Sequence, residues 1–459
     1  MENESKVEAT KVIVGLGKTG LSCARYLNSQ GERFKVVDSR ENPPCLDKFV
    51  CEFPDIECEL GEFSTSTFVN ASELIVSPGV SLNIDVIIKA RESGVPVTGD
   101  IDIFSKVAGA PIVAVTGSNG KSTVVSLLAE IFSKAGIDCG LGGNLDGENA
   151  MPALDLLSEP IKDLYILELS SFQLETTRCL NAEVAVILNV SEDHMDRYDG
   201  LESYLSAKQR IFRGSRKIII NKDSQYSKPP GECEAQIWEF GIEDSEIRGF
   251  RLLRNEDEEI LAYNLEKIIS VNDLKIFGRH NISNVLAAMT IAKAMDVDME
   301  VIREVVQQFA GLPHRCQWVA QIDGVNFYND SKGTNVGATV AAIEGLGQRL
   351  SGHIILIAGG VGKGADFSPL RAVLNRWAKE VILIGRDAKE IAAVLDSEMR
   401  TYFAKDMLDA VNTALVKAGP GDAVLLSPAS ASFDMFRNFE HRGQVFTDTV
   451  RSLQCQQKH

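Results

Sequence analysis

The sequence predicts an α/β protein of three domains built on mainly parallel sheets. Short β-branched runs alternate with longer amphipathic stretches along the whole chain, which is the pattern of successive strand and helix units. At 459 residues the chain is also too long for one hydrophobic core. We expect a Rossmann-like domain at 1–99, a central domain at 100–311 and a C-terminal Rossmann-like domain at 312–459. The breakers in Gly311-Leu-Pro313 suggest the second boundary.

The expected elements follow this order. In the first block, apolar runs predict strands at 11–14, 34–37 and 73–76, closing near 95–99. In the second block, strands are expected at 111–116, 164–169, 184–189 and 217–220. The charged, weakly periodic stretch 231–272 suggests hairpins, and a helix is expected at 281–295. In the third block, strands are expected at 325–328, 353–358, 380–384 and 423–426, each followed by a helix.

Composition excludes several classes of protein. The net charge of −17 argues against nucleic-acid binding, which requires clustered Lys and Arg. No apolar run approaches the roughly 18 residues of a membrane span. The polar start, Met1 to Lys11, does not resemble a signal peptide, and the nine cysteines form no C-x-x-C pair. We therefore expect a cytoplasmic protein with reduced thiols, no nucleic-acid partner and no membrane span.

A glycine-rich segment between an expected strand and an expected helix predicts a phosphate-binding loop. The segment is Thr116-Gly-Ser-Asn-Gly-Lys-Ser-Thr123, so its contacts would come from Gly117, Ser118, Asn119, Gly120, Lys121, Ser122 and Thr123. Backbone N–H groups would hold phosphate oxygens, Lys121 would bridge the terminal phosphates, and the Ser122 hydroxyl would reach Mg²⁺. The strict G-x-x-x-x-G-K-[ST] pattern fails at Val115. The alternative is a glycine turn without a ligand.

A second glycine turn, Gly15-Leu-Gly-Lys-Thr-Gly20, follows the first strand, and Asp38 ends the next one. This combination is formally a dinucleotide-binding fingerprint. By itself the signal is weak and leaves three interpretations open. The turn could bind NAD, it could be purely structural, or it could bind another nucleotide through its diphosphate.

Two polar residues follow strands of the central block. Glu168 closes one strand and His194 lies just beyond the next. Because ligands collect at the carboxyl ends of parallel strands, this pair could bind Mg²⁺ or its waters beside the phosphate loop. Lys208, in Ser206-Ala-Lys-Gln-Arg210, resembles a solvated helix face when judged from pattern alone.

Several motifs in order resemble the Mur ligases of bacterial peptidoglycan synthesis, and the resemblance covers nearly the whole chain. The motifs are the phosphate loop, Leu167-Glu-Leu-Ser-Ser-Phe-Gln-Leu-Glu175, Leu188-Asn-Val-Ser-Glu-Asp-His-Met-Asp196, Gly311-Leu-Pro-His-Arg315, Asn329-Asp-Ser-Lys332 and Leu426-Ser-Pro-Ala-Ser-Ala-Ser-Phe-Asp434. The resemblance implies a monomeric ligase that uses ATP and Mg²⁺. Its implied reaction adds D-glutamate to UDP-N-acetylmuramoyl-L-alanine through an acyl phosphate.

The resemblance also implies roles for individual residues. The UDP-sugar would lie near Thr19, Ser39, Arg40 and Gly79, with Asn144 and His194 also on the substrate. Lys208 would be carbamylated and would join Ser122, Glu168 and His194 as Mg²⁺ ligands, which reverses its interpretation from pattern. Asn281 and Asn284 would contact adenine, and Arg315 and Asp330 would contact phosphate and ribose. D-glutamate would be held by Lys332, Thr334, Lys363, Ser432 and Phe439.

The chain departs from the family pattern in three places. The loop between Asn144 and Pro152 is longer than usual, Lys18 occupies a position that is often apolar, and Gly333 replaces a common alanine. Two rival functions are a folylpolyglutamate-synthase-like ligase and a nucleotide-binding regulatory protein with a degenerate active site. The regulatory protein would be expected to lack Lys121, Glu168 or His194, and all three residues are present.

Overall fold

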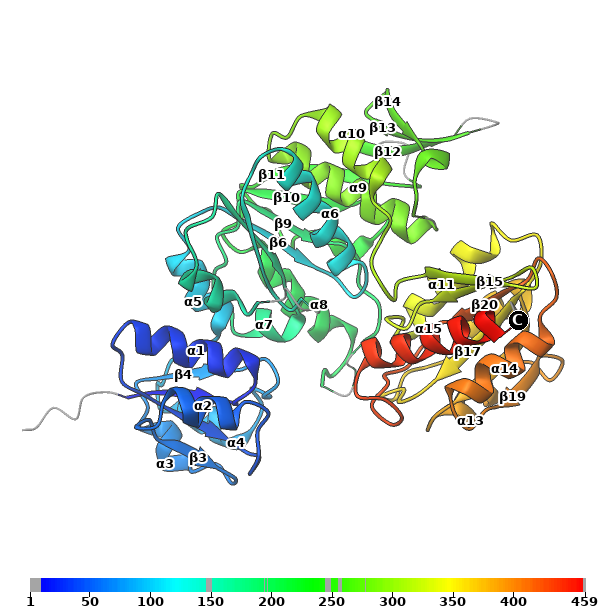
Figure 1. Cartoon of the computed structure of the whole chain (residues 1–459). Coiled ribbons are helices and arrows are strands. Elements are labelled where there is room, and N and C mark those ends of the chain that lie inside the picture. The colour runs from blue at the N-terminus through cyan, green and yellow to red at the C-terminus, as the bar shows by residue number, and fades with distance from the viewer. Residues whose placement is uncertain are drawn as a thin grey trace, which may run out of the picture.

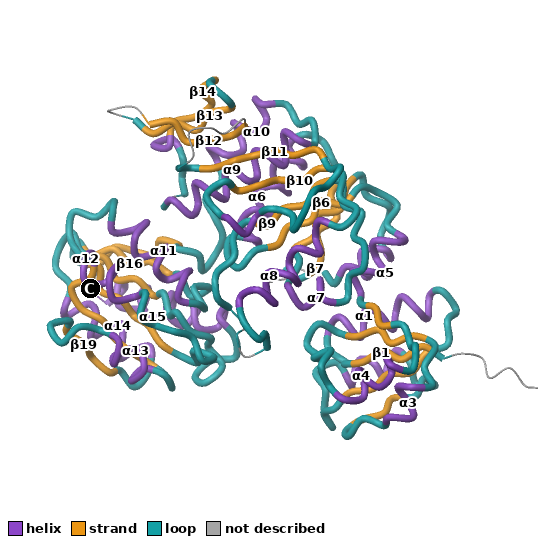
Figure 2. The backbone as a smooth tube through the Cα atoms, turned by 180° about the vertical axis from the view of Figure 1, so that it is seen from behind, coloured by secondary structure: helices purple, strands orange, loops and turns teal. Residues whose placement is uncertain are grey.

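The computed structural model describes residues 10–145, 151–193, 195, 197–243, 249–254, 258–276 and 278–456. The chain forms three lobes, each built on its own sheet (Figure 1). The middle lobe adjoins both others, as the view from behind also shows (Figure 2). The predicted α/β class with three mainly parallel sheets is confirmed.

The first sheet has five parallel strands in the order β3-β2-β1-β4-β5. The strands are β1 Lys11–Val14, β2 Phe34–Asp38, β3 Cys58–Leu60, β4 Glu73–Val76 and β5 Val97–Thr98, and the helices are α1 Lys18–Ser29, α2 Leu46–Glu52, α3 Thr65–Val69 and α4 Asp85–Glu92. The strand order reverses at β1, so a crevice opens at the carboxyl ends of β1 and β4. The glycine turn that follows β1 lies in this crevice.

The second sheet has nine strands in the order β14-β13-β12-β11-β10-β9-β6-β8-β7. They are β6 Ile112–Thr116, β7 Cys139–Gly143, β8 Leu164–Glu168, β9 Val184–Ile187, β10 Lys217–Asn221, β11 Gln236–Gly241, β12 Gly249–Arg254, β13 Glu259–Tyr263 and β14 Glu266–Ser270. Only the β12-β13-β14 end is antiparallel. These hairpins fall in the stretch where the sequence suggested them.

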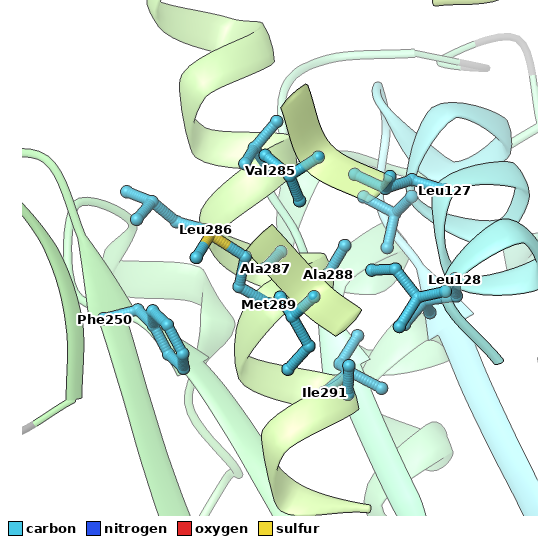
Figure 3. Packing of buried hydrophobic residues seen from close by; sticks show 14 of the residues in the cluster. Leu127, Leu128, Phe250, Val285, Leu286, Ala287, Ala288, Met289 and Ile291 are labelled. Carbon is cyan, nitrogen blue, oxygen red and sulfur yellow. The ribbon is translucent and has the colours of Figure 1, made fainter. Parts of the chain in front are cut away.

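The helices of the middle lobe carry much of the site. They are α5 Asp100–Val107, α6 Lys121–Lys134, α7 Ser171–Glu175, α8 Leu201–Gln209, the short 3-10 helix η2 Arg210–Phe212, α9 Arg279–Ala294 and α10 Met299–Gln308. Leu127 and Leu128 of α6 pack beside Ala288 and Ile291 of α9 in one buried cluster (Figure 3). Burial of one such leucine stabilises the fold by about 1.5–3 kcal/mol. The packing fixes α6, whose first turn follows the phosphate loop, against α9.

The third sheet has six strands in the order β15-β16-β20-β17-β18-β19, and only the β15–β16 pair is antiparallel. The strands are β15 Gln317–Ile322, β16 Val325–Asn329, β17 Ile354–Gly359, β18 Ala378–Ile384, β19 Arg400–Phe403 and β20 Ala423–Leu426. The helices are α11 Val336–Gly347, α12 Leu370–Trp377, α13 Ala388–Val394, α14 Met407–Lys417 and α15 Phe439–Gln456. Within the described residues, no helix is both long enough and apolar enough to cross a membrane.

Candidate active site

The phosphate loop joins buried strand β6 to helix α6, as its sequence predicted. Lys121 opens α6, and its Nζ donates to the carbonyl oxygens of Gly117 at 3.0 Å and Ser118 at 3.3 Å. Burial lowers the pKa of Lys121, and Glu168 opposes that shift. The two hydrogen bonds hold the Lys121 side chain inside the loop, where an anionic ligand would be well placed to replace the two carbonyl contacts.

Position 120 requires glycine for two reasons, its backbone conformation and the close approach of Asn284. Its φ is +84°, in the left-handed region, and an added Cβ would lie 2.2 Å from Oδ1 of Asn284. Asn284 belongs to α9, so the absence of a side chain at Gly120 lets α9 approach the loop. One side chain that the resemblance places on the nucleotide therefore touches the predicted phosphate loop directly.

A polar network connects Ser122 with Glu168, Asn144 and Arg315. The Ser122 hydroxyl donates to Glu168 Oε2 at 2.7 Å and accepts from Arg315 Nη2 at 3.0 Å. Asn144 Nδ2 is 3.4 Å from the other Glu168 oxygen. Arg315 lies just before β15, so this contact joins the third lobe to the phosphate loop.

Lys208 lies inside the protein and not on a solvated face. Its side chain is 1% exposed, and Nζ donates to the carbonyl oxygen of Gly117 at 3.0 Å and lies 4.5 Å from the centre of the Tyr204 ring. Burial, aided by the charge of Lys121, lowers the pKa of Lys208 well below its usual value. The solvated-face interpretation of Lys208 is wrong, because the helical pattern of α8 could not reveal that this face meets β6.

A central cavity of about 540 Å³ brings together residues from all three lobes. The predicted site residues that line it are Ser118, Lys121, Asn144, Lys208, Lys332, Thr334, Lys363, Ser432 and Phe439. Lys332 Nζ lies 3.8 Å from the centre of the Phe439 ring. Two lysines from the third lobe therefore face the same space as Lys121 from the middle lobe.

A second cavity of about 290 Å³ lies on the other side of the phosphate loop. The predicted nucleotide contacts that line it are Asn119, Gly120, Thr123, Asn281, Asn284, Arg315 and Asp330. Burial raises the pKa of Asp330 to about 6, although hydrogen bonds from Ser427 and from the Cys316 N–H oppose the shift. Lys332 lines both this cavity and the central one, so the two spaces adjoin at that lysine.

A third cavity of about 450 Å³ lies over the glycine turn after β1. It is lined by Thr19, Ser39, Arg40, Gly79 and Asn144, for which the resemblance implies contacts with the UDP-sugar substrate. Asp38 accepts from the Leu16 N–H at 2.7 Å and from Arg40 Nε at 2.8 Å. Burial alone would raise the pKa of Asp38, but its hydrogen bonds with Arg40 and Leu16 lower it. Because Arg40 already engages the carboxylate, Asp38 is poorly placed to bind the ribose of NAD.

The sequence did not identify two residues as part of this site. Lys18, noted only as a departure, lines both the third and the central cavity. Arg442 of α15 is 1% exposed and donates to Ser331 Oγ at 3.0 Å, to the Ser331 carbonyl oxygen at 2.7 Å and to the Ser430 carbonyl oxygen at 3.0 Å. It therefore fastens the two loops that carry Lys332 and Ser432. No local pattern distinguishes it from an ordinary helix arginine.

One expected residue, His194, and the longer loop at 146–150 lie outside the described residues. No group of three His, Cys, Asp or Glu side chains suited to a metal occurs in the part of the chain that the structure describes. The Mg²⁺ ligands that the resemblance implies are Ser122, Glu168, Lys208 and His194, and the last of these lies outside the described residues.

Comparison with known families matches each lobe in order. The Mur ligase MurD-like N-terminal domain matches residues 9–99, the Mur ligase middle domain matches 115–292, and the Mur ligase glutamate ligase domain matches 314–430. The chain belongs to the Mur ligase family and is therefore a ligase.

Its similar relatives point to one member of that family. The chain is 47% identical to the UDP-N-acetylmuramoylalanine–D-glutamate ligase of Pseudomonas aeruginosa, over 96% of this chain and 98% of the relative. It is 48% identical to the protein of the same name from Nitrosococcus oceani, over 98% of each.

Solved structures confirm the fold. A pseudomurein peptide ligase type C from Methanothermus fervidus aligns with a TM-score of 0.61 at 18% identity, over 97% of this chain and 100% of that one. MurF from Acinetobacter baumannii aligns with a TM-score of 0.62 at 15% identity, over 95% of this chain and 90% of that one.

Proposed function

We propose that this chain catalyses the ATP-dependent addition of D-glutamate to UDP-N-acetylmuramoyl-L-alanine during synthesis of the peptidoglycan precursor. One observation carries the proposal: Lys121 of the phosphate loop and the expected D-glutamate residues of the third lobe line the same cavity. The near full-length identity to D-glutamate ligases supports the same substrates.

The proposed reaction has two steps. An oxygen of the alanine carboxylate attacks the γ-phosphorus of ATP, ADP leaves, and an acyl phosphate forms. The amine of D-glutamate then attacks the carbonyl carbon, and phosphate leaves with the oxygen that came from the carboxylate while the amine loses a proton. Lys121 and Arg315 would neutralise charge on the transferring phosphoryl group, since both lie at the loop.

The amino-acid side of the cavity suits a dicarboxylate. Lys332 and Lys363 provide two cations, and Thr334 and Ser432 provide hydroxyl groups in the same space. Charge-assisted hydrogen bonds of this kind are well matched to the two carboxylates of D-glutamate. Phe439 positions Lys332 through their close contact.

The residues beside the loop also fit Mg²⁺. Ser122 and Glu168 are hydrogen-bonded to each other, and the buried amine of Lys208 is favoured in its neutral form, which is the form that can react with CO₂ to give a carbamate. We propose Ser122, Glu168, His194 and carbamylated Lys208 as the metal-binding set. Bound Mg²⁺ would supply positive charge to the phosphate oxygens.

The proposed domains keep their expected bounds: 1–99 for the UDP-sugar, 100–311 for ATP and 312–459 for the amino acid. We also propose that the chain acts as a monomer. Every cysteine with a described side chain is a free thiol, which supports a reducing compartment such as the cytoplasm.

The test is phosphate release from ATP and UDP-N-acetylmuramoyl-L-alanine with a panel of D- and L-amino acids. We expect release with D-glutamate and little with L-glutamate or D-aspartate. Calorimetry of the same preparation should detect binding of UDP-N-acetylmuramoyl-L-alanine and none of NAD. Release that depends on a folate and L-glutamate would support the folylpolyglutamate-type alternative and contradict the proposal.

A further inference from the structure

A fourth cavity, of about 500 Å³, lies between the first and the middle lobe, and its lining contains four arginines. It is lined by Arg91 of α4, by Arg197, by Arg210 of η2 and by Arg213 just beyond it. We refer to this cavity as the arginine cleft. It shares no lining residue with the three cavities described above, so it is separate from the site of ligation.

One of the four arginines has a structural role. Arg197 pairs with Glu175 at 3.1 Å and donates to the carbonyl oxygens of Pro78 at 2.8 Å and Val80 at 3.0 Å. It therefore connects the middle lobe to the first lobe and offsets part of the negative charge of Glu175. Arg210 donates to the Glu175 backbone carbonyl, which carries no net charge.

The other three arginines leave an excess of positive charge. Among the described residues, Arg91, Arg210 and Arg213 form no ion pair, and the remaining acidic residue of the lining is the exposed Asp199. This excess stands out in a chain whose net charge is −17. The pKa of Arg210 is lowered, first by burial and then by the charge of Arg213; the charge of Glu175 opposes the shift, and Arg91 adds a smaller contribution that lowers the pKa. An anion between them would relieve that repulsion.

The lining also matches the chemistry of a phosphate group. Guanidinium groups bind phosphate oxygens through paired N–H donors, and Ser206 and Asn83 add hydroxyl and amide donors to the same walls. A cleft with one sign of charge also concentrates the opposite ion. We propose that the arginine cleft binds a phosphate oxyanion, either free phosphate or a phosphate monoester, and that the anion bridges Arg91 of the first lobe to Arg210 and Arg213 of the middle lobe.

The test is a calorimetric titration with orthophosphate, and in parallel with glycerol 3-phosphate, at constant ionic strength set with chloride. The phosphate loop is also expected to bind phosphate, so the Lys121→Ala chain serves as the reference. Binding of phosphate to the arginine cleft should persist in that chain. Adding Arg91→Gln or Arg213→Gln to that chain should weaken the remaining binding by about tenfold or more. Both side chains are exposed and form no ion pair with any described residue, so the unfolding curves of these variants should overlay that of the reference.

The matched control is Arg376→Gln, an exposed arginine of α12 in the third lobe, which should leave the affinity unchanged. Tighter binding of orthophosphate would identify a free-ion site, and tighter binding of glycerol 3-phosphate would identify an ester site. The proposal is overturned if the Lys121→Ala chain binds neither anion up to about 10 mM, which would mean a binding free energy weaker than about −3 kcal/mol. It is also overturned if Arg91→Gln has no effect, because the anion would then not bridge the lobes.

Discussion

Lys208 places a primary amine where an ammonium ion is poorly tolerated. It is buried against β6, it donates to a backbone carbonyl, and the charge of Lys121 adds to the cost of protonation. Burial therefore favours the neutral amine, which is the form that reacts with CO₂, and the resulting carbamate would convert a cation into an anion. Its burial beside Gly117 thus provides a physical reason for the role that the family resemblance assigns to it.

We expect Lys208→Ala to be nearly inactive, at least about 100-fold below the unchanged protein, which corresponds to about 2.7 kcal/mol. Acetate or formate should partly restore phosphate release, because a short carboxylate can enter the vacated space and replace the carbamate. The measurement is initial rate against acetate concentration at constant ionic strength.

The control for this rescue is Lys389→Ala, an exposed lysine of α13, which should be fully active and insensitive to acetate. A Lys208→Ala protein with normal activity would remove Lys208 from the metal site. Equal stimulation of both variants by acetate would show a salt effect.

Asp100, at the start of α5, is a buried carboxylate whose charge should depend on pH. It accepts from Gln173 Nε2 at 3.3 Å, while its Oδ1 has no hydrogen-bond partner among the described residues. Burial raises its pKa to about 6 from the ordinary value of 3.8. Between these two values the folded chain binds more protons than the unfolded chain, so stability falls as the pH rises through this window.

We therefore expect Asp100→Asn to be more stable than the unchanged protein at pH 7.5, by about 1–3 kcal/mol. The advantage should shrink at pH 5, where the native carboxyl is largely protonated. Thermal unfolding midpoints at the two pH values measure this. An advantage of the same size at both pH values would mean that the asparagine acts by packing and not by removing a charge.

At the scale of elements, α15 positions two binding loops from behind. Arg442 supplies three hydrogen bonds to Ser331 and Ser430, and Asn329 Nδ2 donates to the Gly443 carbonyl at 2.9 Å and to Thr447 Oγ1 at 3.0 Å. Burial lowers the pKa of Arg442 to about 10, which still leaves it charged at neutral pH. The helix therefore fixes the positions of the loops that carry Lys332 and Ser432.

Arg442→Lys should raise the KM for D-glutamate about tenfold while changing the KM for ATP much less, because one ammonium cannot span both loops. Loss of guanidinium hydrogen bonds to Ser331 and Ser430 should also lower the free energy of unfolding by about 1–3 kcal/mol. Arg451→Lys, at an exposed position on the same helix, is the matched control. Equal increases in both KM values would indicate general loosening of the fold and contradict a positioning role.

Elements with strong apolar runs could be predicted from the sequence, and weak or glycine-rich ones could not. The predicted strands at 11–14, 73–76 and 423–426 coincide with β1, β4 and β20. The strand β7 has the sequence Cys-Gly-Leu-Gly-Gly and resembles a loop, while β3 and β19 are short edge strands with mixed polarity. Sheet pairing stabilises these edge strands, and local pattern carries no record of it.

At the scale of the molecule, the central cavity exists only because three lobes meet. The third lobe meets the middle lobe through polar contacts, such as Arg315 to Ser122 and Asn335 Nδ2 to Asn119 Oδ1 at 3.2 Å. The first and middle lobes instead share a buried apolar cluster. Motifs could indicate that each lobe holds part of a site, because phosphate loops have a local signature. They could not show that Lys18 faces two cavities or that Arg442 fastens two loops of the third lobe, since both depend on long-range placement.

The central claim is that ligation passes through an acyl phosphate formed in this cavity. The most direct test uses UDP-N-acetylmuramoyl-L-alanine with ¹⁸O at both oxygens of the alanine carboxylate, incubated with ATP and D-glutamate. Phosphate leaves with the oxygen that attacked the γ-phosphorus, so mass spectrometry should find one ¹⁸O in each phosphate released. Phosphate without ¹⁸O, released alongside the amide product, would mean that water cleaved ATP and that the carboxylate was never phosphorylated, which contradicts the account.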